Sequence, residues 1–582
     1  MFEIKDTFYL NGKPFKIISG AIHYFRVVPE YWQDRLEKLK AMGCNTVETY
    51  IPWNMHEPKK SKYRFDGMLD VRRFVETAHK LGLYVILRPS PYICAEWEFG
   101  GLPGWLLAED GMRLRTCYEP FLKHIADYYD KLFEIISPLQ INYGGPVIMM
   151  QVENEYGYYG SDSEYLEKMK QMMVDRGVVV PLITSDGPYD ESLICGRIKG
   201  VLQTGNFGSH TKERFELLKK HIGNKPLMCA EFWVGWFDHW GNGGHMRGNL
   251  EQSVEDLDEM LRQGNVNIYM FQGGTNFGFM NGSNYYDELT PDVTSYDYDG
   301  ILTEDGQITE KYRRYKEVVA KYAPIPEVEF TTDIKRIAYD RLPVKEKTSL
   351  FANLDNLSEK TSSPFPVSME KLGQNYGYIL YRSKLEKEQN FEKIKLWKAN
   401  DRANILIDER QVLTLYDREL LVEHEIKENR PDVSNNPNID ILVENMGRVN
   451  FGPRMDDQRK GIDGCVQING HIHHNWDIYP LPLEDISKVD FNKEYKEGVP
   501  AFYKLEFDAE EIGYKFLDFE GWGKGCVFVN GFNIGRFWEI GPQKRLYIPG
   551  PLLKKGMNEI IVFETEGKVK ETIELKDEPD IG

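Results

Sequence analysis

Two short acidic segments follow apolar stretches of the chain and carry residue types that could do chemistry. Residues 147–152, largely apolar, run into Glu153-Asn154-Glu155, and residues 227–230 run into Glu231. Opposite strands of a barrel can aim carboxylates at a common point near the carboxyl ends of the strands. Two carboxyl groups flanking one bond are what glycoside hydrolysis needs: one donates a proton, and the other attacks the anomeric carbon or activates water.

A single Glu at a strand end is more often a solvated loop residue than a catalytic group. The pair is more specific, because each Glu follows a predicted buried strand and Asn154 adds a donor and an acceptor suited to a sugar hydroxyl. Aromatic residues gather in the predicted loops, and their flat faces suit pyranose rings, although any one of them is more often a core residue. They are Trp97, Phe99, Trp105, Trp233, Trp236, Phe237 and Trp240.

The elements that must position these groups form a repeating pattern over residues 1–325. Short apolar runs alternate with stretches of helical periodicity, which is typical of a (β/α)8 TIM barrel. Two prolines, Pro324 and Pro326, mark the end of this catalytic domain. The predicted strands are 17–22, 46–50, 84–87, 147–152, 182–184, 200–204, 227–230 and 267–271, with helices at 32–42, 69–81, 121–136, 163–175, 253–262 and 309–322.

From about residue 330 the pattern changes to short alternating strands with turn signals. It indicates two β-sandwich domains, over 326–490 and 491–582, so the predicted fold class is α/β plus all-β. The boundary between them rests on the charged run 493–497 and the following Gly498-Val499-Pro500. Because the alternation continues across that break, the prediction leaves open that part of residues 326–490 packs with the second β domain.

Composition narrows the class of protein. The 582 residues are 41% hydrophobic and 28% charged, which is typical of a folded multidomain chain. With 91 acidic against 72 basic residues the net charge is −19, which disfavours nucleic acid and anionic membranes as partners. We see neither a secretory signal nor an 18-residue apolar run, so we predict a cytoplasmic protein whose seven scattered cysteines are reduced. The sequence allows a homodimer without deciding the oligomeric state.

Several competing chemistries lack their motifs. The chain has no P-loop, no dinucleotide-binding glycine motif, no G-x-S-x-G turn and no H-E-x-x-H helix. His471, His473 and His474 fall in a predicted β region, where such residues are more often surface or strand residues than metal ligands. We therefore predict no cofactor and no metal.

The chain resembles the β-galactosidases of glycoside hydrolase family 35, and most of all their compact bacterial members. The resemblance implies a TIM barrel followed by jelly-roll domains, and hydrolysis of terminal non-reducing β-D-galactose from oligosaccharides by a retaining double displacement. By the same resemblance Glu155 is the acid and then the base, and Glu231 is the nucleophile. The matching segments are 19–24, 47–54, 88–98, 151–157 and 294–299, with 529–538 resembling the family's terminal galactose-binding-like β domain.

The resemblance also implies a substrate site. We expect Trp236 and Trp240 to form walls of the acceptor subsite, Trp233 to stand where many members have Tyr, and Arg88 to lower the pKa of Glu231. A preference for β-1,3 linkages is one expectation, but the choice between β-1,3 and β-1,4 linkages stays open, as do a retaining glycosidase for another sugar and a noncatalytic glycan-binding protein. The residues implied around the terminal galactose are Tyr50, Cys94, Ala95, Glu96, Asn154 and Tyr298.

Overall fold

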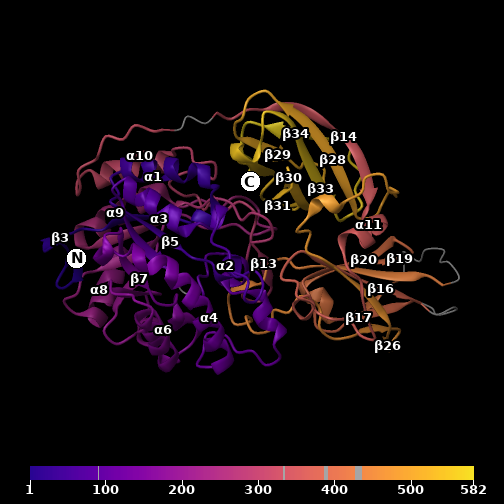
Figure 1. Ribbon diagram of the computed structural model, residues 1–582, viewed down its shortest axis with the longest axis horizontal. Helices are drawn as coiled ribbons and strands as arrows, with labels where there is room; N and C mark the ends of the chain where they lie inside the picture. The colour runs from indigo at the N-terminus through magenta and orange to yellow at the C-terminus, as the bar shows by residue number, and fades with distance from the viewer. Residues whose placement is uncertain (90, 332–334, 386–390, 427–435) are drawn as a thin grey trace.

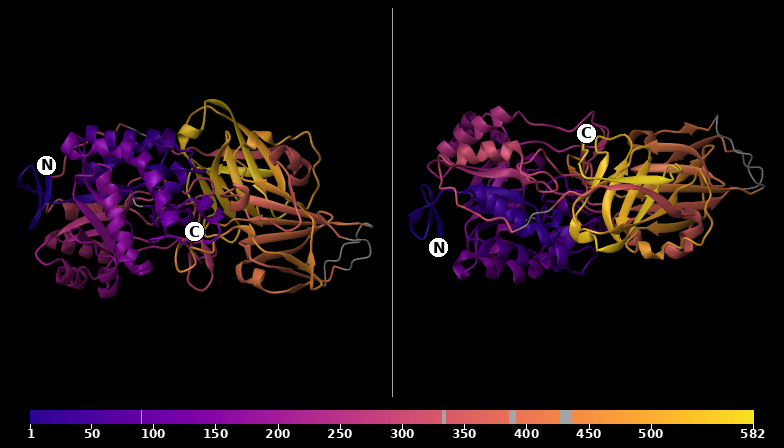
Figure 2. Two further views of the ribbon diagram at one scale, coloured as in Figure 1. Left: turned by 60° about the horizontal axis from the view of Figure 1, so that its bottom comes forward. Right: turned by 90° about the horizontal axis from the view of Figure 1, so that it is seen from above.

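The protein consists of an α/β barrel followed by all-β domains. The computed structural model describes residues 1–89, 91–331, 335–385, 391–426 and 436–582. The barrel, drawn in indigo to magenta, lies beside the all-β part, drawn in orange to yellow (Figure 1). Both views of Figure 2 place the all-β part on the side of the barrel away from the N-terminus. The predicted fold class is confirmed.

Eight parallel strands close into the barrel in the order β10-β11-β4-β5-β6-β7-β8-β9. Their short apolar runs are buried almost throughout, as expected for parallel strands that helices cover. All eight predicted strands are present, with ends shifted by a few residues. They are β4 (Ile18–Ile22), β5 (Thr46–Tyr50), β6 (Tyr84–Arg88), β7 (Val147–Gln151), β8 (Leu182–Asp186), β9 (Leu202–Asn206), β10 (Met228–Trp233) and β11 (Asn265–Gln272).

Amphipathic helices surround the barrel. Asn249 caps α9 by accepting a hydrogen bond from Gln252 N (3.1 Å), which satisfies one of the free amides of its first turn. The prediction missed α8, because few apolar positions of this charged segment face the core. The helices are α1 (Trp32–Ala41), α2 (Trp53–His56), α3 (Val71–Lys80), α4 (Glu119–Ile136), α5 (Tyr156–Tyr159), α6 (Ser163–Asp175), α7 (Asp190–Cys195), α8 (Thr211–Ile222), α9 (Leu250–Gln263), α10 (Glu310–Val319) and, beyond the barrel, α11 (Leu350–Leu357).

A six-stranded and a four-stranded sheet build the first all-β unit. Apolar residues from both sheets form one core cluster, which is the arrangement of a sandwich. The six-stranded sheet contains β15 (Thr361–Ser363), β27 (Trp476–Leu481), β16 (Tyr378–Lys384), β22 (Asn438–Glu444), β19 (Arg402–Ile407) and β20 (Arg410–Tyr416). The four-stranded sheet contains β21 (His424–Glu425), β17 (Lys393–Leu396), β25 (Val466–Ile468) and β26 (His471–His473).

An eight-stranded sheet builds the C-terminal unit, in the order β31-β30-β33-β28-β14-β34-β29-β32. β14 comes from the range expected for the first all-β domain but pairs with β28 and β34, so the two β units interleave along the chain. The strands are β31 (Phe532–Trp538), β30 (Lys524–Val529), β33 (Gly556–Glu564), β28 (Ala501–Ala509), β14 (Tyr339–Ser349), β34 (Thr572–Lys576), β29 (Lys515–Asp518) and β32 (Arg545–Ile548).

A small sheet joins the barrel to the first all-β unit. The barrel loop after β11 forms β12 (Ser283–Tyr285) and β13 (Leu289–Pro291), and β23 (Val449–Phe451) of the all-β unit pairs with β12. Backbone hydrogen bonds therefore cross between the two units, which fixes the position of β23 relative to the ends of the barrel strands.

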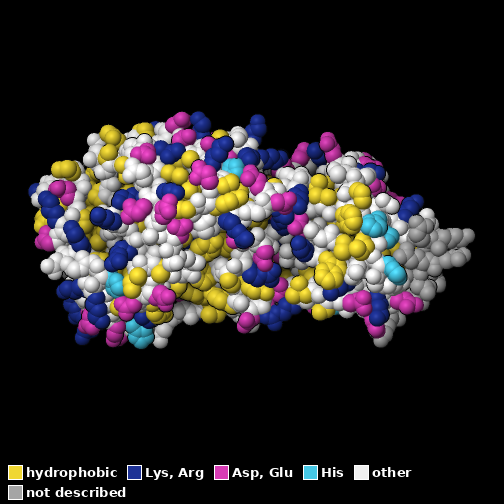
Figure 3. Space-filling model, turned by 90° about the horizontal axis from the view of Figure 1, so that it is seen from below, with side chains coloured by type: hydrophobic (Ala, Val, Ile, Leu, Met, Phe, Trp, Pro, Cys, Tyr) yellow, Lys and Arg dark blue, Asp and Glu magenta, His cyan; other side chains and the backbone are white. Residues whose placement is uncertain are grey.

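The surface carries both signs of charge, interspersed on the face that Figure 3 shows. All seven cysteines are free thiols. Within the described part of the chain, no helix is both long and apolar enough to span a membrane.

Candidate active site

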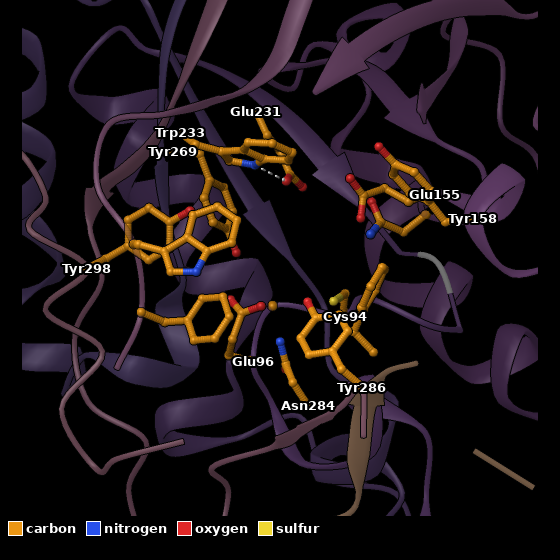
Figure 4. A pocket seen from close by; sticks show the side chains of 15 residues that line it. Cys94, Glu96, Glu155, Tyr158, Glu231, Trp233, Tyr269, Asn284, Tyr286 and Tyr298 are labelled. Carbon is orange, nitrogen blue, oxygen red and sulfur yellow. Dashed lines mark hydrogen bonds between the residues drawn. The ribbon is translucent and has the colours of Figure 1, made fainter. Parts of the chain in front are cut away.

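A pocket of about 150 Å³ opens at the carboxyl ends of the barrel strands. Figure 4 shows the carboxyl groups of Glu155 and Glu231 pointing into the same space. The pocket is lined by Cys94, Ala95, Glu96, Asn154, Glu155, Tyr158, Glu231, Trp233, Trp236, Phe237, Tyr269, Asn284, Tyr286, Tyr298 and Phe451. Both predicted catalytic residues therefore share one pocket.

Glu231 lies inside β10 rather than after it, because the strand runs on to Trp233 past an irregularity in its register. Its Oε1 lies 2.7 Å from Arg88 Nη2 and accepts a hydrogen bond from Tyr50 Oη (2.6 Å). Its Oε2 accepts a hydrogen bond from Trp233 Nε1 (3.1 Å), drawn dashed in Figure 4. A guanidinium and two neutral donors thus stabilise a carboxylate in a buried site.

The adjacent glutamates Glu153 and Glu155 are in different environments. Glu153 is 1% exposed, and Arg115 donates to both of its oxygens at 2.8 Å, so it forms a structural ion pair outside the pocket lining. Glu155 lies two residues on, with a left-handed backbone (φ 46°) and its side chain in the pocket. Only Glu155 of the two can reach a bound ligand.

Burial raises the pKa of Glu155 to about 8, and the nearby negative charge of Glu231 adds to this rise. Asn206 Nδ2 donates to Glu155 Oε1 at 2.9 Å and acts in the opposite direction, because this bond stabilises the carboxylate. Glu155 therefore carries a proton at neutral pH, next to a carboxylate that is held by Arg88. A proton donor and a paired carboxylate facing one cavity can perform acid-assisted nucleophilic displacement.

Asn154 is fixed from several sides. Its Oδ1 accepts hydrogen bonds from Arg88 Nη2 (2.9 Å) and Gln151 Nε2 (3.0 Å), and it lies 2.8 Å from Tyr50 Oη, whose one hydroxyl hydrogen it shares with Glu231. Because the amide oxygen is used in this way, the Nδ2 group is the part of Asn154 left to serve the pocket as a donor. Tyr50 is 1% exposed and acts behind the lining, through Glu231 and Asn154.

Cys94, Ala95 and Glu96 form a run of left-handed residues with φ of 54°, 58° and 48°. This uncommon backbone turns all three toward the pocket, which they line. Tyr296 Oη donates to Glu96 Oε2. Burial raises the pKa of Glu96 to about 7, while that hydrogen bond and the charge of Arg26 oppose the rise.

The three tryptophans predicted for the substrate site lie in two different environments. Trp233 and Trp236 line the pocket, and Trp236 is 39% exposed at its mouth. Trp240 does not line it. Its ring is 6% exposed and lies against Trp538 of the C-terminal unit, with the ring centroids 6.5 Å apart. Trp240 therefore makes an interdomain contact and is not among the residues that line this pocket. Tyr298, the remaining predicted residue, does line the pocket.

Sequence reasoning missed several lining residues. Tyr158 and Tyr269 lie close to predicted strand ends, so their position on the chain was a usable signal. Asn284, Tyr286 and Phe451 gave no such signal, because β12 and β23 bring them to the pocket by a pairing between distant segments. Phe451 belongs to the first all-β unit, so the site is not built by the barrel alone.

Metal-binding geometry is absent from the described part of the molecule. Within the residues that the structure describes, no group of three or more His, Cys, Asp or Glu side chains is arranged to hold a metal ion. His473 contacts Ser383 Oγ at 2.9 Å, and His471 and His473 lie at the two ends of β26. His471 and His473 therefore belong to an edge strand of a β-sheet, and His474 is the residue directly after that strand.

Comparison with known proteins gives three matching family descriptions. Residues 7–322 match Glycosyl hydrolases family 35; residues 366–482 match Beta-galactosidase, first all-beta domain; residues 500–558 match Beta-galactosidase, galactose-binding domain. The chain is 40% identical to Beta-galactosidase-1-like protein 2 of Homo sapiens over 594 residues, which cover 99% of this chain and 91% of that protein.

Two further relatives come from a plant and a bacterium. Beta-galactosidase 17 of Arabidopsis thaliana is 38% identical over 609 residues (97% of this chain, 87% of that protein). Beta-galactosidase of Xanthomonas manihotis is 38% identical over 549 residues (93% of this chain, 90% of that protein). Similarity therefore extends over nearly the whole chain and across kingdoms.

Proposed function

The chain belongs to glycosyl hydrolases family 35, and from this membership we propose that it is an exo-acting, retaining β-galactosidase. It is a glycoside hydrolase, and the names of its relatives support β-D-galactosides as substrates. The observation that carries the mechanism is the contrast between two carboxyl groups in one pocket. Glu155 has a raised pKa, whereas Glu231 is bound by Arg88 at 2.7 Å.

In the first step Glu231 attacks the anomeric carbon of the galactoside. The bond from that carbon to the leaving oxygen breaks, and Glu155 gives its proton to this oxygen, so the aglycone leaves as a neutral alcohol. The galactosyl group is then an ester of Glu231. Tyr50, Arg88 and Trp233 hold the attacking carboxylate in place before the reaction.

In the second step Glu155 acts as the base. Esterification removes the negative charge of Glu231, and that charge was one cause of the raised pKa of Glu155. The pKa of Glu155 therefore falls once the intermediate forms, which suits it to take a proton from water. The water oxygen attacks the anomeric carbon and displaces Glu231, so galactose leaves with its original β configuration and both residues return to their starting states.

The size of the pocket supports release of a single terminal sugar. A volume of about 150 Å³ is small beside the roughly 300–1,000 Å³ of pockets for drug-sized ligands, and suits one ring better than an internal stretch of polysaccharide. Glu96, Asn154 and Tyr298 supply acceptors and donors for the hydroxyl groups of that ring. We propose that the remaining sugars leave past Trp236 at the exposed mouth.

The test is hydrolysis of an aryl β-galactoside by the purified protein, beside a panel of other aryl glycosides. Proton NMR of the first product should show β-galactose, because two inversions retain the configuration. Glu155→Gln and Glu231→Gln should each lose most activity. Full activity in both variants contradicts the site, α-galactose as first product contradicts the retaining mechanism, and a faster rate on another glycoside contradicts the sugar assignment.

Linkage is tested separately. Matched β-1,3- and β-1,4-linked galactosyl-N-acetylglucosamine disaccharides at equal concentration report the preference as a ratio of kcat/KM. We propose a preference for the β-1,3 disaccharide, which a ratio near one or a faster β-1,4 rate would overturn.

A further inference from the structure

The free edge of strand β31 in the C-terminal unit is covered by a loop of the barrel. β31 is the outermost strand of its eight-stranded sheet, so one side of its backbone has no strand partner in that sheet. Thr294 takes that place: its Oγ1 accepts from Arg536 N at 3.0 Å and donates to Arg536 O at 2.8 Å. An edge that would otherwise be open to water or to another chain is thus used for an internal contact.

β31 and the turn that follows it contact three loops at the carboxyl ends of the barrel strands. The first loop follows β10. The second follows β11 directly, and the third, farther along the same connection, contains residues 294–299. Each loop is hydrogen-bonded to the start of β31 or to the turn after that strand. These bonds run from Gly278 N to Asn533 O (3.0 Å), from Ser295 N to Gln543 Oε1 (2.9 Å) and from Gly241 N to Gly541 O (2.9 Å).

Two of these loops carry residues of the pocket. The loop after β10 carries Trp236 and Phe237, and the third carries Tyr298 four residues after Thr294. Tyr296, between them, donates to Glu96. A displacement of Thr294 therefore reaches a pocket wall and the partner of Glu96 within a few residues of chain.

Arg536 ties this contact to the first all-β unit. Its side chain is 1% exposed, and Nε donates to Asn281 Oδ1 of the barrel loop at 2.9 Å. Nη1 lies 2.6 Å from Glu444 Oε1, and Nη2 donates to Asn445 O at 2.7 Å. One buried guanidinium thus joins all three parts of the molecule with its charge paired and each nitrogen bonded.

Gly535 makes the close approach possible. Its φ is +134°, which strains any residue with a side chain, and a Cβ at this position would lie 2.2 Å from Thr294 Cγ2 and 2.8 Å from Thr294 Oγ1. A larger residue therefore requires Thr294 or β31 to shift. By contrast Gly531, in the same hairpin, has φ +84°, and a Cβ there would have nothing within 4 Å, so substitution adds backbone strain without a clash.

We propose that β31 positions the active site, with Gly535 and Arg536 as positioning residues for the loops that carry Tyr298 and Trp236. The proposal rests on the proposed function in one respect, since the loops concerned are those of the galactoside pocket. It assigns to this surface of the C-terminal unit a role in shaping the barrel site.

The experiment compares Gly535→Ala with its matched control Gly531→Ala in the full chain. We expect Gly535→Ala to lower kcat/KM for an aryl β-galactoside by at least roughly tenfold, mainly through KM, since displacements of about 1 Å cost that much or more. Gly531→Ala should stay within about twofold of wild type. Adding Thr294→Ser to Gly535→Ala removes the closer of the two clashes, the one with the methyl group, and keeps the hydroxyl, so it should restore part of the loss.

Hydrogen exchange of residues 294–299 gives a readout that does not depend on turnover. It should speed up in Gly535→Ala and not in Gly531→Ala. Wild-type protein without galactosidase activity would contradict the proposed function alone, and the exchange data would still decide the role of β31. The proposed role of β31 would be overturned if Gly535→Ala had the same kinetics and the same exchange rates as the wild-type protein, or if both glycine variants had equal effects. Should Gly535→Ala fail to fold, Gln543→Met, which removes the acceptor of Ser295 N, must show the same changes.

Discussion

Arg88 Nη2 lies 2.7 Å from Glu231 Oε1 in a buried ion pair at the centre of the barrel. The second terminal nitrogen of the same guanidinium, Nη1, lies 3.7 Å from Glu48 Oε1, and neither of these two atoms has a hydrogen-bond partner among the described residues. One positive charge therefore faces two carboxyl groups, and it lies closer to Glu231 than to Glu48. Burial raises the pKa of Glu48 to about 7, which keeps Glu48 largely protonated in acid and leaves the charge of Arg88 to Glu231.

Glu48→Gln tests this division of charge. Below pH 7 glutamine resembles the protonated side chain, so kcat/KM at pH 6 should stay within about threefold of wild type. Above pH 7 the wild-type carboxyl ionises, whereas glutamine does not, and the two pH profiles should separate there. A large loss of activity at pH 6 would show that Glu48 works as a charged group.

The same substitution has a predicted effect on stability. An acid whose pKa is raised on folding does not lower the free energy of unfolding when the pH is below its unfolded pKa. The destabilisation grows as the pH rises from the unfolded to the folded pKa. Because folding raises the pKa of Glu48 from 4.5 to about 7, Glu48→Gln removes a destabilisation on the order of 3–4 kcal/mol at pH 8 and about 0.4 kcal/mol at pH 4.5. Thermal unfolding should therefore show a much larger stabilisation at pH 8 than at pH 4.5; an equal shift at both would contradict the raised pKa.

Glu155 predicts the alkaline limit of activity. Its pKa of about 8 means that the proton donor is present below pH 8 and is lost above it, so kcat/KM should fall through that region. Asn206→Ala removes the hydrogen bond that stabilises the carboxylate and should move this limit to higher pH. A shift to lower pH, or no shift with normal folding, would contradict the assignment of Glu155 as the acid.

Glu153→Gln should affect folding more than chemistry. It leaves Arg115 buried beside a neutral partner, and breaking such a pair typically costs about 3–5 kcal/mol. The matched variant is Glu155→Gln, two residues away, which should lose activity while its melting temperature changes little. If Glu153→Gln kept the wild-type melting temperature and lost activity, the roles of the two glutamates would have to be revised.

Much of this site was predictable because its parts are encoded locally. The strands before Glu155 and Glu231 are short apolar runs, and a parallel barrel brings their ends together wherever the intervening helices lie. Residue types alone do not separate Glu153 from Glu155, since the distinction depends on Arg115, 38 residues away. Family resemblance selected Glu155, and the ion pair of Glu153 now supplies a physical reason for that choice.

Trp240 and Phe451 mark the limit of such reasoning. Trp240 shares a loop with Trp236, yet one ring lines the pocket and the other packs on Trp538, which depends on where the C-terminal unit docks. Phe451 enters the pocket because β23 pairs with β12, a register set between domains. Pairings between distant segments have no local periodicity and so leave no signal in a single sequence.

Phe451 leads to a prediction about acceptor binding. Its ring lies 6.1 Å from that of Tyr158, three residues after Glu155, and 6.4 Å from that of Tyr286 at the mouth. In the proposed mechanism Glu155 protonates the leaving oxygen, so we expect residues on its side of the pocket to contact the acceptor sugar. An aromatic contact of roughly 0.5–1.5 kcal/mol corresponds to a change of about two- to tenfold.

Phe451→Ala should therefore raise KM for galactosyl disaccharides by about two- to tenfold, with a smaller effect on kcat for an aryl galactoside that has a small leaving group. Phe365→Ala, in the same all-β unit but 45% exposed and outside the pocket, is the control and should change neither value. Equal losses on both substrates would place Phe451 against the galactose ring instead. No loss on either would mean that the first all-β unit only supports the barrel, because Phe451 is its one described residue among those that line the pocket.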